Sequence, residues 1–295
     1  MQTTEDVAGE KEKEFKSENL VWTRIYYGRE VMDRILDTID VKRALHKRFF
    51  LRYTLRAAMA GVIICLMYIF AYQVKTDVGQ DFNAGLNKYL MSASFSMALV
   101  FIYFTNSELL TSNFMYFTVG RYYDKVSWGD TIRIWSLCLV GNLLGIVVIA
   151  VLVWSCGMLK ESMVDNLVHT VNDKTSNSAW LIFVKAIFAN YFINVSVIVA
   201  MQLKEHLAKI LVLLMGVTVF AYMGFDHVIA NSALFVMALL EQPENVSAVL
   251  MGKNFLLSFV GNYVGGGLVI GLFYAYLNDH RKDELRPRED LRTRA

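Results

Sequence analysis

The chain has 295 residues, 55% of them hydrophobic, and its mean hydropathy is +0.38. Soluble domains are about 45–50% apolar, so this composition excludes an ordinary soluble domain and favours a membrane protein. The formal net charge is only +2, and Lys and Arg lie beside apolar segments instead of forming one basic stripe. Nucleic acid is therefore not expected as a partner.

Charged residues concentrate at the two ends of the chain. We expect three parts: a cytoplasmic N-terminal segment (1–50), a transmembrane domain in the lipid bilayer (51–280) and a basic cytoplasmic tail (281–295). Within 19–50, apolar residues recur at mostly helical spacing among charges, which predicts an amphipathic helix at the membrane interface. This helix would serve either as a packing and oligomer contact or as a gate.

Apolar stretches of about 20 residues, the length that crosses a bilayer, follow in chain order. The pattern predicts an all-α membrane protein with six transmembrane helices. The expected spans are 54–74, 90–127, 131–157, 179–201, 207–240 and 254–277.

The second and fifth spans are interrupted by polar residues. The second contains NSELLTSN at 106–113, and the fifth contains DHVIANS at 226–232. Nonhelical backbone at membrane depth is tolerated only where protein buries it or water lines it. Both breaks are therefore expected to face a pathway.

The Lys and Arg residues of the short connections predict the orientation. They are more frequent in the connections on the N-terminal side of the membrane, and the tail is also basic. Because Lys and Arg favour cytoplasmic loops, both termini are expected in the cytoplasm, with the protein in the cell membrane.

An internal repeat supports a two-fold organisation. VGNLLGIVVIAVLV begins at Val140, and VGNYVGGGLVIGLFY begins 120 residues later at Val260. Three spans in each half would turn the second half upside down relative to the first, giving two inverted three-helix repeats with a site near the bilayer midplane. The N-termini of the half helices carry partial positive charge, so such a centre favours anions.

Four segments resemble the formate/nitrite transporter family: SELLTSN, GFDHVIANSALFV, FANYFINVSV and SFVGNYVGGGLVIG. The resemblance spans about 55–280. It implies an aquaporin-like fold, a homopentamer with one pore per subunit, and passage of small monovalent anions or their weak acids, such as formate, nitrite, lactate, acetate or hydrosulfide. A water channel is not expected, because neither proline, Pro243 or Pro287, lies at a break.

The resemblance also implies roles for individual residues. Thr111, Asn190 and His227 match the central polar triad of the family, and Lys174 matches the basic residue of its outer vestibule. Hydrophobic constrictions are implied on the outer side and on the inner side of this triad. The outer candidates are Phe95 and Phe220, and the inner candidates are Leu99, Leu109 and additionally Leu110.

Each polar candidate also has a purely structural interpretation. His227 would otherwise be a neutral, hydrogen-bonded core histidine, but the helix break around it favours a functional role. Thr111 and Asn190 fit interhelical hydrogen bonding equally well. Lys174 fits a solvated surface lysine. Lys185 lies in an apolar run, where an unpaired charge is costly, so it is expected to reach outward or to meet a partner.

We expect transport linked to protons through His227, since apolar constrictions oppose a bare anion more than its neutral acid. No cofactor or metal is expected, because the cysteines lack metal-ligand spacing. No enzyme is expected either, since no nucleophile has a base beside it. The alternative is a membrane scaffold or regulatory protein without transport, for which flux of small acids would stay at background.

Overall fold

The computed structural model describes residues 28–79, 83–279 and 281. These residues form helices and contain no strand, which confirms the all-α prediction. In chain order the helices are α2 (Arg29–Arg48), α3 (Phe50–Val78), α4 (Ala84–Phe104), α5 (Leu110–Tyr122), α6 (Trp128–Ser155), α7 (Glu161–Ser176), α8 (Ala179–Gln202), α9 (His206–Tyr222), α10 (Val228–Glu241), η1 (Pro243–Asn245), α11 (Ala248–Asn262), the π-helical η2 (Tyr263–Leu272) and α12 (Phe273–Leu277).

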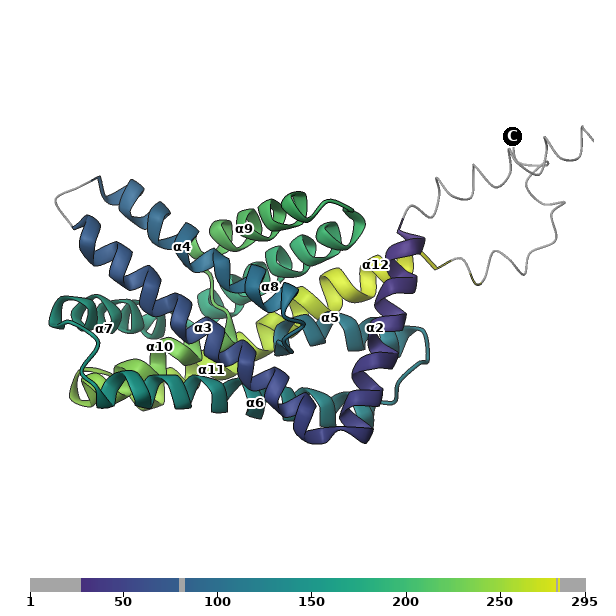
Figure 1. Ribbon diagram of the computed structural model, residues 1–295, viewed down its shortest axis with the longest axis horizontal. Coiled ribbons are helices and arrows are strands. Elements are labelled where there is room, and N and C mark those ends of the chain that lie inside the picture. Colours follow the sequence, from purple (N-terminus) through teal and green to yellow (C-terminus); the bar gives the residue numbers. More distant parts are fainter. Residues whose placement is uncertain (1–27, 80–82, 280, 282–295) are drawn as a thin grey trace, which may run out of the picture.

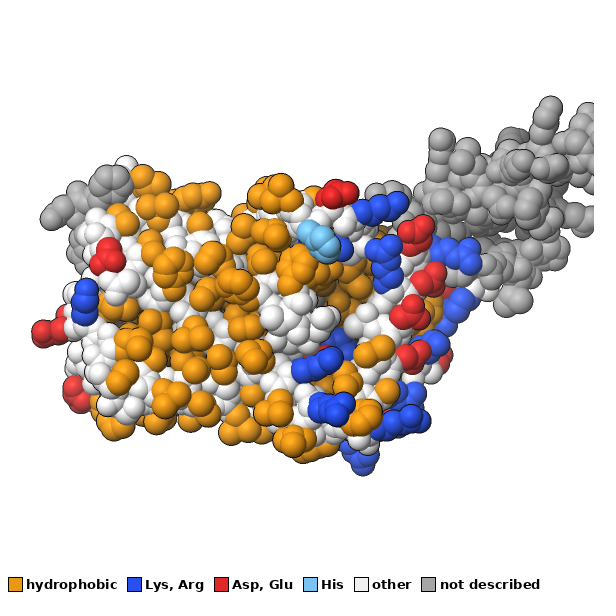
Figure 2. Space-filling model, viewed as in Figure 1, with side chains coloured by type: hydrophobic (Ala, Val, Ile, Leu, Met, Phe, Trp, Pro, Cys, Tyr) orange, Lys and Arg blue, Asp and Glu red, His pale blue; other side chains and the backbone are white. Residues whose placement is uncertain are grey.

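The lengths and composition of the helices fit a bilayer. Five stretches are long and apolar enough to cross a membrane, namely α3, α4, α6, α8 and the continuous run from α11 through η2 to α12, and α9 and α10 are shorter apolar helices. Apolar side chains cover the long face of the molecule, and charged side chains gather toward the end where α2 lies (Figure 2). The chain is a transmembrane protein.

Small residues bring two pairs of helices into close contact. A Cβ on Gly145 of α6 would lie 1.9 Å from the carbonyl oxygen of Ala58 in α3, and a Cβ on Gly265 of η2 would lie 2.1 Å from the carbonyl oxygen of Ile187 in α8. Only glycine allows two backbones this close. Helices α3 and α6 therefore form one closely packed pair, and α8 with the α11–η2 run forms the other.

The predicted breaks exist, but they begin earlier and are shorter than expected. Helix α4 ends at Phe104 and α5 begins at Leu110, whereas α9 ends at Tyr222 and α10 begins at Val228. The predicted extents 106–113 and 226–232 were thus wrong, because half of their polar residues lie at the start of α5 and α10.

Backbone chemistry explains why both breaks begin where they do. Asn106 and Gly224 have positive φ angles of 51° and 67°. In each case the next residue returns a hydrogen bond to the helix just completed, from Ser107 N to Ile102 O at 3.1 Å and from Phe225 N to Phe220 O at 3.0 Å. This is the Schellman arrangement, in which glycine or asparagine closes a helix.

Two amphipathic helices lie at opposite ends of the bundle (Figure 1). Helix α2 buries an apolar stripe of Val31, Ile35 and Ile39 and packs against α3, α5 and α8. The predicted amphipathic helix is therefore present from Arg29, whereas residues 19–27 and the tail 282–295 lie outside the described residues. Helix α7 was not predicted; it lies between the expected third and fourth spans.

Candidate functional site

Asn142 of α6 anchors the first break. Its Oδ1 accepts a hydrogen bond from the backbone N–H of Leu110 at 3.1 Å, and its Nδ2 donates to the carbonyl oxygens of Ala57 and Glu108 at 2.7 and 2.8 Å. The Leu110 N–H would otherwise be unpaired at the start of a half helix inside an apolar bundle. One buried amide therefore satisfies three backbone groups.

Asn262 of α11 anchors the second break in the same way. The backbone N–H of Val228 donates to its Oδ1 at 2.8 Å, and its Nδ2 donates to the carbonyl oxygens of Ala186 and Asp226 at 2.7 and 2.9 Å. The two anchors are the asparagines of the repeated Val-Gly-Asn motif. The repeat in the sequence thus marks the residues that hold the breaks open.

A buried ion pair also fixes the first break. The Lys42 ammonium of α2 donates to the Glu108 carboxylate, and their side chains are only 11% and 4% exposed. Asn113 Nδ2 donates to the same Glu108 oxygen at 3.2 Å. Helix α2 is therefore tied directly to the nonhelical segment.

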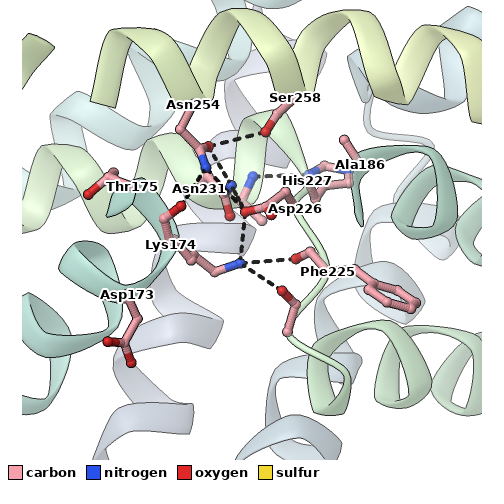
Figure 3. Close-up of polar contacts among 12 residues, drawn as sticks. Asp173, Lys174, Thr175, Ala186, Phe225, Asp226, His227, Asn231, Asn254 and Ser258 are labelled. Carbon is pink, nitrogen blue, oxygen red and sulfur yellow. Dashed lines mark hydrogen bonds and ion pairs between the residues drawn. The ribbon is translucent and has the colours of Figure 1, made fainter. Parts of the chain in front are cut away.

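The second break has a matching pair (Figure 3). Lys174 Nζ of α7 lies 3.2 Å from Asp226 Oδ1 and donates to the carbonyl oxygen of Phe225 at 3.0 Å. Asn231 Nδ2 donates to Asp226 Oδ1 at 2.8 Å, while Asp173 points away from this cluster. The ammonium of Lys174 is thus already engaged with the break.

The first turns of α5 and α10 meet at Thr111 and His227. Thr111 Oγ1 lies 2.8 Å from His227 Nε2, and the Ala230 N–H donates to His227 Nδ1 at 3.0 Å. Because Nδ1 accepts a hydrogen bond, the neutral imidazole carries its proton on Nε2 and donates it to Thr111. The hydroxyl proton of Thr111 is then free to be donated to another group.

Asn190 of α8 joins this contact through the backbone. Its Nδ2 donates to the carbonyl oxygens of Thr111 at 3.0 Å and of Asn262 at 2.7 Å, and Asn194 Nδ2 donates to its Oδ1 at 2.9 Å. Gly266 permits this packing, because a Cβ there would lie 2.1 Å from Asn190 Nδ2. The structure thus brings Thr111, Asn190 and His227 together.

Two cavities lie on either side of an aromatic pair. The larger, of about 920 Å³, is named here the lysine cavity because four lysines line it: Lys75, Lys88, Lys174 and Lys185. The smaller, of about 20 Å³, is named the central cavity, and its lining includes Leu99, Leu109 and His227.

Phe95 and Phe220 are the residues that the two cavities share. Their rings lie 6.2 Å apart in an edge-to-face arrangement. Leu110 lines neither cavity and is fully buried elsewhere in the core. Of the five constriction candidates, four line the central cavity.

Reasoning from the sequence missed the residues that hold the site together, namely Lys42, Glu108, Asn142 and Asn262. The repeated Val-Gly-Asn motif was a signal for the two asparagines, and an acidic residue in both breaks was a signal for the ion pairs. The alternative of a solvated surface lysine does not fit Lys174, whose side chain is only 13% exposed in the last turn of α7.

Two half helices whose first turns meet inside an apolar bundle, with buried polar groups beside two cavities, define a transmembrane protein of the channel or transporter type. The formate/nitrite transporter family model matches residues 29–276. The chain therefore belongs to the formate/nitrite transporter family.

Curated relatives agree with this family. The chain is 29% identical over 233 residues to "Uncharacterized transporter YwcJ" of Bacillus subtilis, covering 77% of this chain and 90% of the relative. It is 29% identical over 230 residues to "Nitrite transporter NirC" of Escherichia coli, covering 77% and 83%. It is 26% identical over 259 residues to "Formate channel FocA" of Escherichia coli, covering 79% and 88%.

Solved structures share the fold. An "FNT family ion channel" superposes with a TM-score of 0.76 at 24% identity, covering 84% of this chain and 98% of that chain. A "Pentameric formate channel with formate bound" superposes with a TM-score of 0.68 at 23% identity, covering 77% and 96%.

Proposed function

We propose that this protein is a channel or transporter for small monovalent anions or their weak acids, of the formate, nitrite, lactate, acetate or hydrosulfide class. The observation that carries the proposal is the contact between Thr111 Oγ1 and His227 Nε2, which lies where α5 and α10 begin. Helix N-termini favour anions, and here two of them converge on one point.

In this proposal Thr111 and His227 bind the substrate together. The imidazole donates from Nε2 to Thr111, so the hydroxyl of Thr111 is left to donate its own proton to an anion oxygen. Asn190 positions Thr111 by holding its carbonyl oxygen. A proton moved between His227 and the substrate, directly or through the hydroxyl, would link transport to protons.

The apolar residues around the central cavity select the form that passes. Phe95 and Phe220 constrict the route on the lysine-cavity side, and Leu99 and Leu109 constrict it on the other side; we assign Leu110 to packing behind them. Transfer of a bare anion through an apolar ring is costly, whereas its neutral acid passes more easily.

The assembly and orientation form part of the same proposal. We propose a homopentamer in the cell membrane, with a pore in each subunit, since the formate channel of similar fold is pentameric. The α2 end faces the cytoplasm together with both termini, because Lys and Arg are abundant beside it, and the lysine cavity faces outward.

Flux measurements in proteoliposomes test the proposal. Purified protein should raise the uptake of at least one small acid well above protein-free liposomes, with a rate that rises as the pH falls between about pH 8 and pH 5, because a lower pH favours protonation of the anion through His227. A competition series ordered by acid size then identifies the preferred substrate. Background flux for formate, nitrite, lactate, acetate and hydrosulfide alike would favour the scaffold instead.

A further inference from the structure

The four lysines of the lysine cavity are not equivalent. Lys174 is bound to Asp226 and to the carbonyl oxygen of Phe225. Lys75 lies over the ring of Tyr72 at 5.6 Å, and Lys88 lies over the ring of Tyr222 at 5.1 Å. Lys185 has no hydrogen bond, ion pair or ring contact within the described ranges, although it is half-buried.

Among the described residues, Lys185 also has no fixed counter-ion in the cavity. The two aspartates that line it are engaged elsewhere: Asp165 accepts a long hydrogen bond of 3.4 Å from Gln242, and Asp173 pairs with His169 at 3.2 Å on the exposed face of α7. An ammonium in an apolar helix is costly unless it is paired or hydrated. Lys185 therefore presents a charge to the cavity that no described carboxylate neutralises.

The position of Lys185 fits the entrance to the proposed route. It lies on α8 one turn before Phe188, whose ring is 5.6 Å from that of Phe225, the residue directly before Asp226. It lines the same cavity as Phe95 and Phe220. An anion held by Lys185 would wait in the cavity that these two rings close.

We propose that Lys185 is the anion-docking residue of the lysine cavity, and that Lys174 instead holds the second break in place. The ligand is a small monovalent anion with exposed acceptor atoms, to which the free ammonium supplies up to three hydrogen bonds. This inference rests on the proposed function, because the docked anion is the substrate of the same route.

Concentration-dependent flux provides the first test. Lys185→Gln should raise the half-saturating concentration of the transported anion about fivefold with little change in maximal rate, while Lys185→Arg should retain the parent value. Lys160→Gln is the matched control, since Lys160 is exposed near the same end and does not line the cavity. An unchanged half-saturating concentration in Lys185→Gln, or an equal change in Lys160→Gln, would overturn the proposal.

Chemical labelling provides a second test that does not depend on transport. Formate or nitrite should slow acetylation of Lys185 in the detergent-solubilised protein, as measured by peptide mass spectrometry, and leave Lys160 unaffected. Equal acetylation rates of Lys185 with and without the anion would overturn the proposal, and would assign its ammonium to contact with lipid head groups or to packing. Labelling protection without any flux would contradict the proposed function but not anion docking, so the two failures are distinguishable.

Discussion

The two helix breaks share one framework but carry different side chains at its centre. Both are closed by a residue with positive φ, anchored by an asparagine and tied to a lysine of an amphipathic helix. At the position directly before the half helix, however, the first break has Leu109 and the second has His227. Two positions later, the first has Thr111 and the second has Ile229.

This difference distinguishes the residues that hold the breaks in place from the polar residues at the centre of the proposed route. The contacts that keep each break nonhelical are duplicated, because the same backbone groups must be satisfied in both halves. The polar pair Thr111 and His227 is not duplicated, since each half supplies one member and an apolar residue stands at the equivalent position. A single polar contact therefore forms from two nearly equivalent half helices.

The largest expected effect comes from removing a buried charge. Asp226→Ala should lower the free energy of unfolding by about 3–5 kcal/mol, because Lys174 is left buried without its carboxylate. Glu108→Ala should cost less, since Glu108 accepts from Lys42 and Asn113, whereas Asp226 Oδ1 accepts from Lys174, Asn231 and Asn254. Thermal unfolding in detergent measures both.

A double variant checks the cause of this loss. Lys174→Gln combined with Asp226→Asn should cost less than the sum of the two single variants, because neither charge is then left alone. Strict additivity would show that the ion pair does not hold the second break.

The two asparagine anchors should contribute equally to stability. Asn142→Leu and Asn262→Leu each remove three hydrogen bonds of 2.7 to 3.1 Å, so each should lower stability by about 3 kcal/mol. Asn172→Leu on the exposed surface of α7 is the control; it removes a single hydrogen bond, of 3.0 Å to the Asn245 carbonyl oxygen, so the expected loss is about 1 kcal/mol or less. A large difference between the two anchors would mean that the halves are not held alike.

Overpacking at Gly266 in η2 should disturb the contact between Asn190 and Thr111. Gly266→Ala places a methyl group 2.1 Å from the resting position of Asn190 Nδ2. We expect a loss of about 1–3 kcal/mol of stability together with reduced flux, because Asn190 must move away from Thr111. Gly252→Ala has open space around its Cβ and serves as the control. Unchanged flux in Gly266→Ala would remove Asn190 from the site.

His227 variants separate its capping role from its proposed proton role. Asn at position 227 can still cap α10 but cannot titrate, so His227→Asn should keep most of the stability and flatten the pH profile of uptake. His227→Leu should flatten the profile and also cost about 1 kcal/mol through loss of the cap. A parent-like profile in both variants would exclude His227 from proton coupling.

The smallest effect is expected after α12, where Asp279 accepts from Tyr122 at the end of α5. The Arg281 guanidinium lowers the pKa of the Asp279 carboxyl to about 2. The contribution of ionised Asp279 to the stability of the fold is therefore complete above the unfolded pKa of about 3.9. It is lost as the pH falls through about 2.

Asp279→Asn should lower the free energy of unfolding by no more than about 1 kcal/mol. The loss should be the same throughout about pH 5 to 8. Thermal melts at several pH values check this. A cost that changes within this range would assign part of the pH response to this end of the protein instead of to His227.

The spans and the existence of both breaks could be predicted from the sequence, since bilayer thickness fixes the length of an apolar helix and polar runs interrupt it. The extents of the breaks could not be predicted from polarity alone. Thr111 and Asn231 are polar but helical, because their groups are satisfied by tertiary contacts, whereas the backbone signal lay at Asn106 and Gly224.

Long-range pairing was the other limit. Lys42 and Glu108 are 66 residues apart, and Thr111 and His227 are 116 residues apart, so no local pattern links them. The resemblance to the family predicted that Thr111 and His227 lie together, whereas no feature of the sequence predicted the pairing of Lys42 with Glu108. Lys185 appeared only as a costly charge until the structure placed it on the lysine cavity.

The order of the ion-pair partners along the chain has a consequence for biosynthesis. In both halves the lysine precedes its carboxylate, by 66 residues for Lys42 and Glu108 and by 52 for Lys174 and Asp226. When the ribosome delivers an acidic break to the insertion machinery, the cation that neutralises it has already been made. The carboxylate of each break can therefore be paired as it inserts, so it need not enter the bilayer as an unpaired charge.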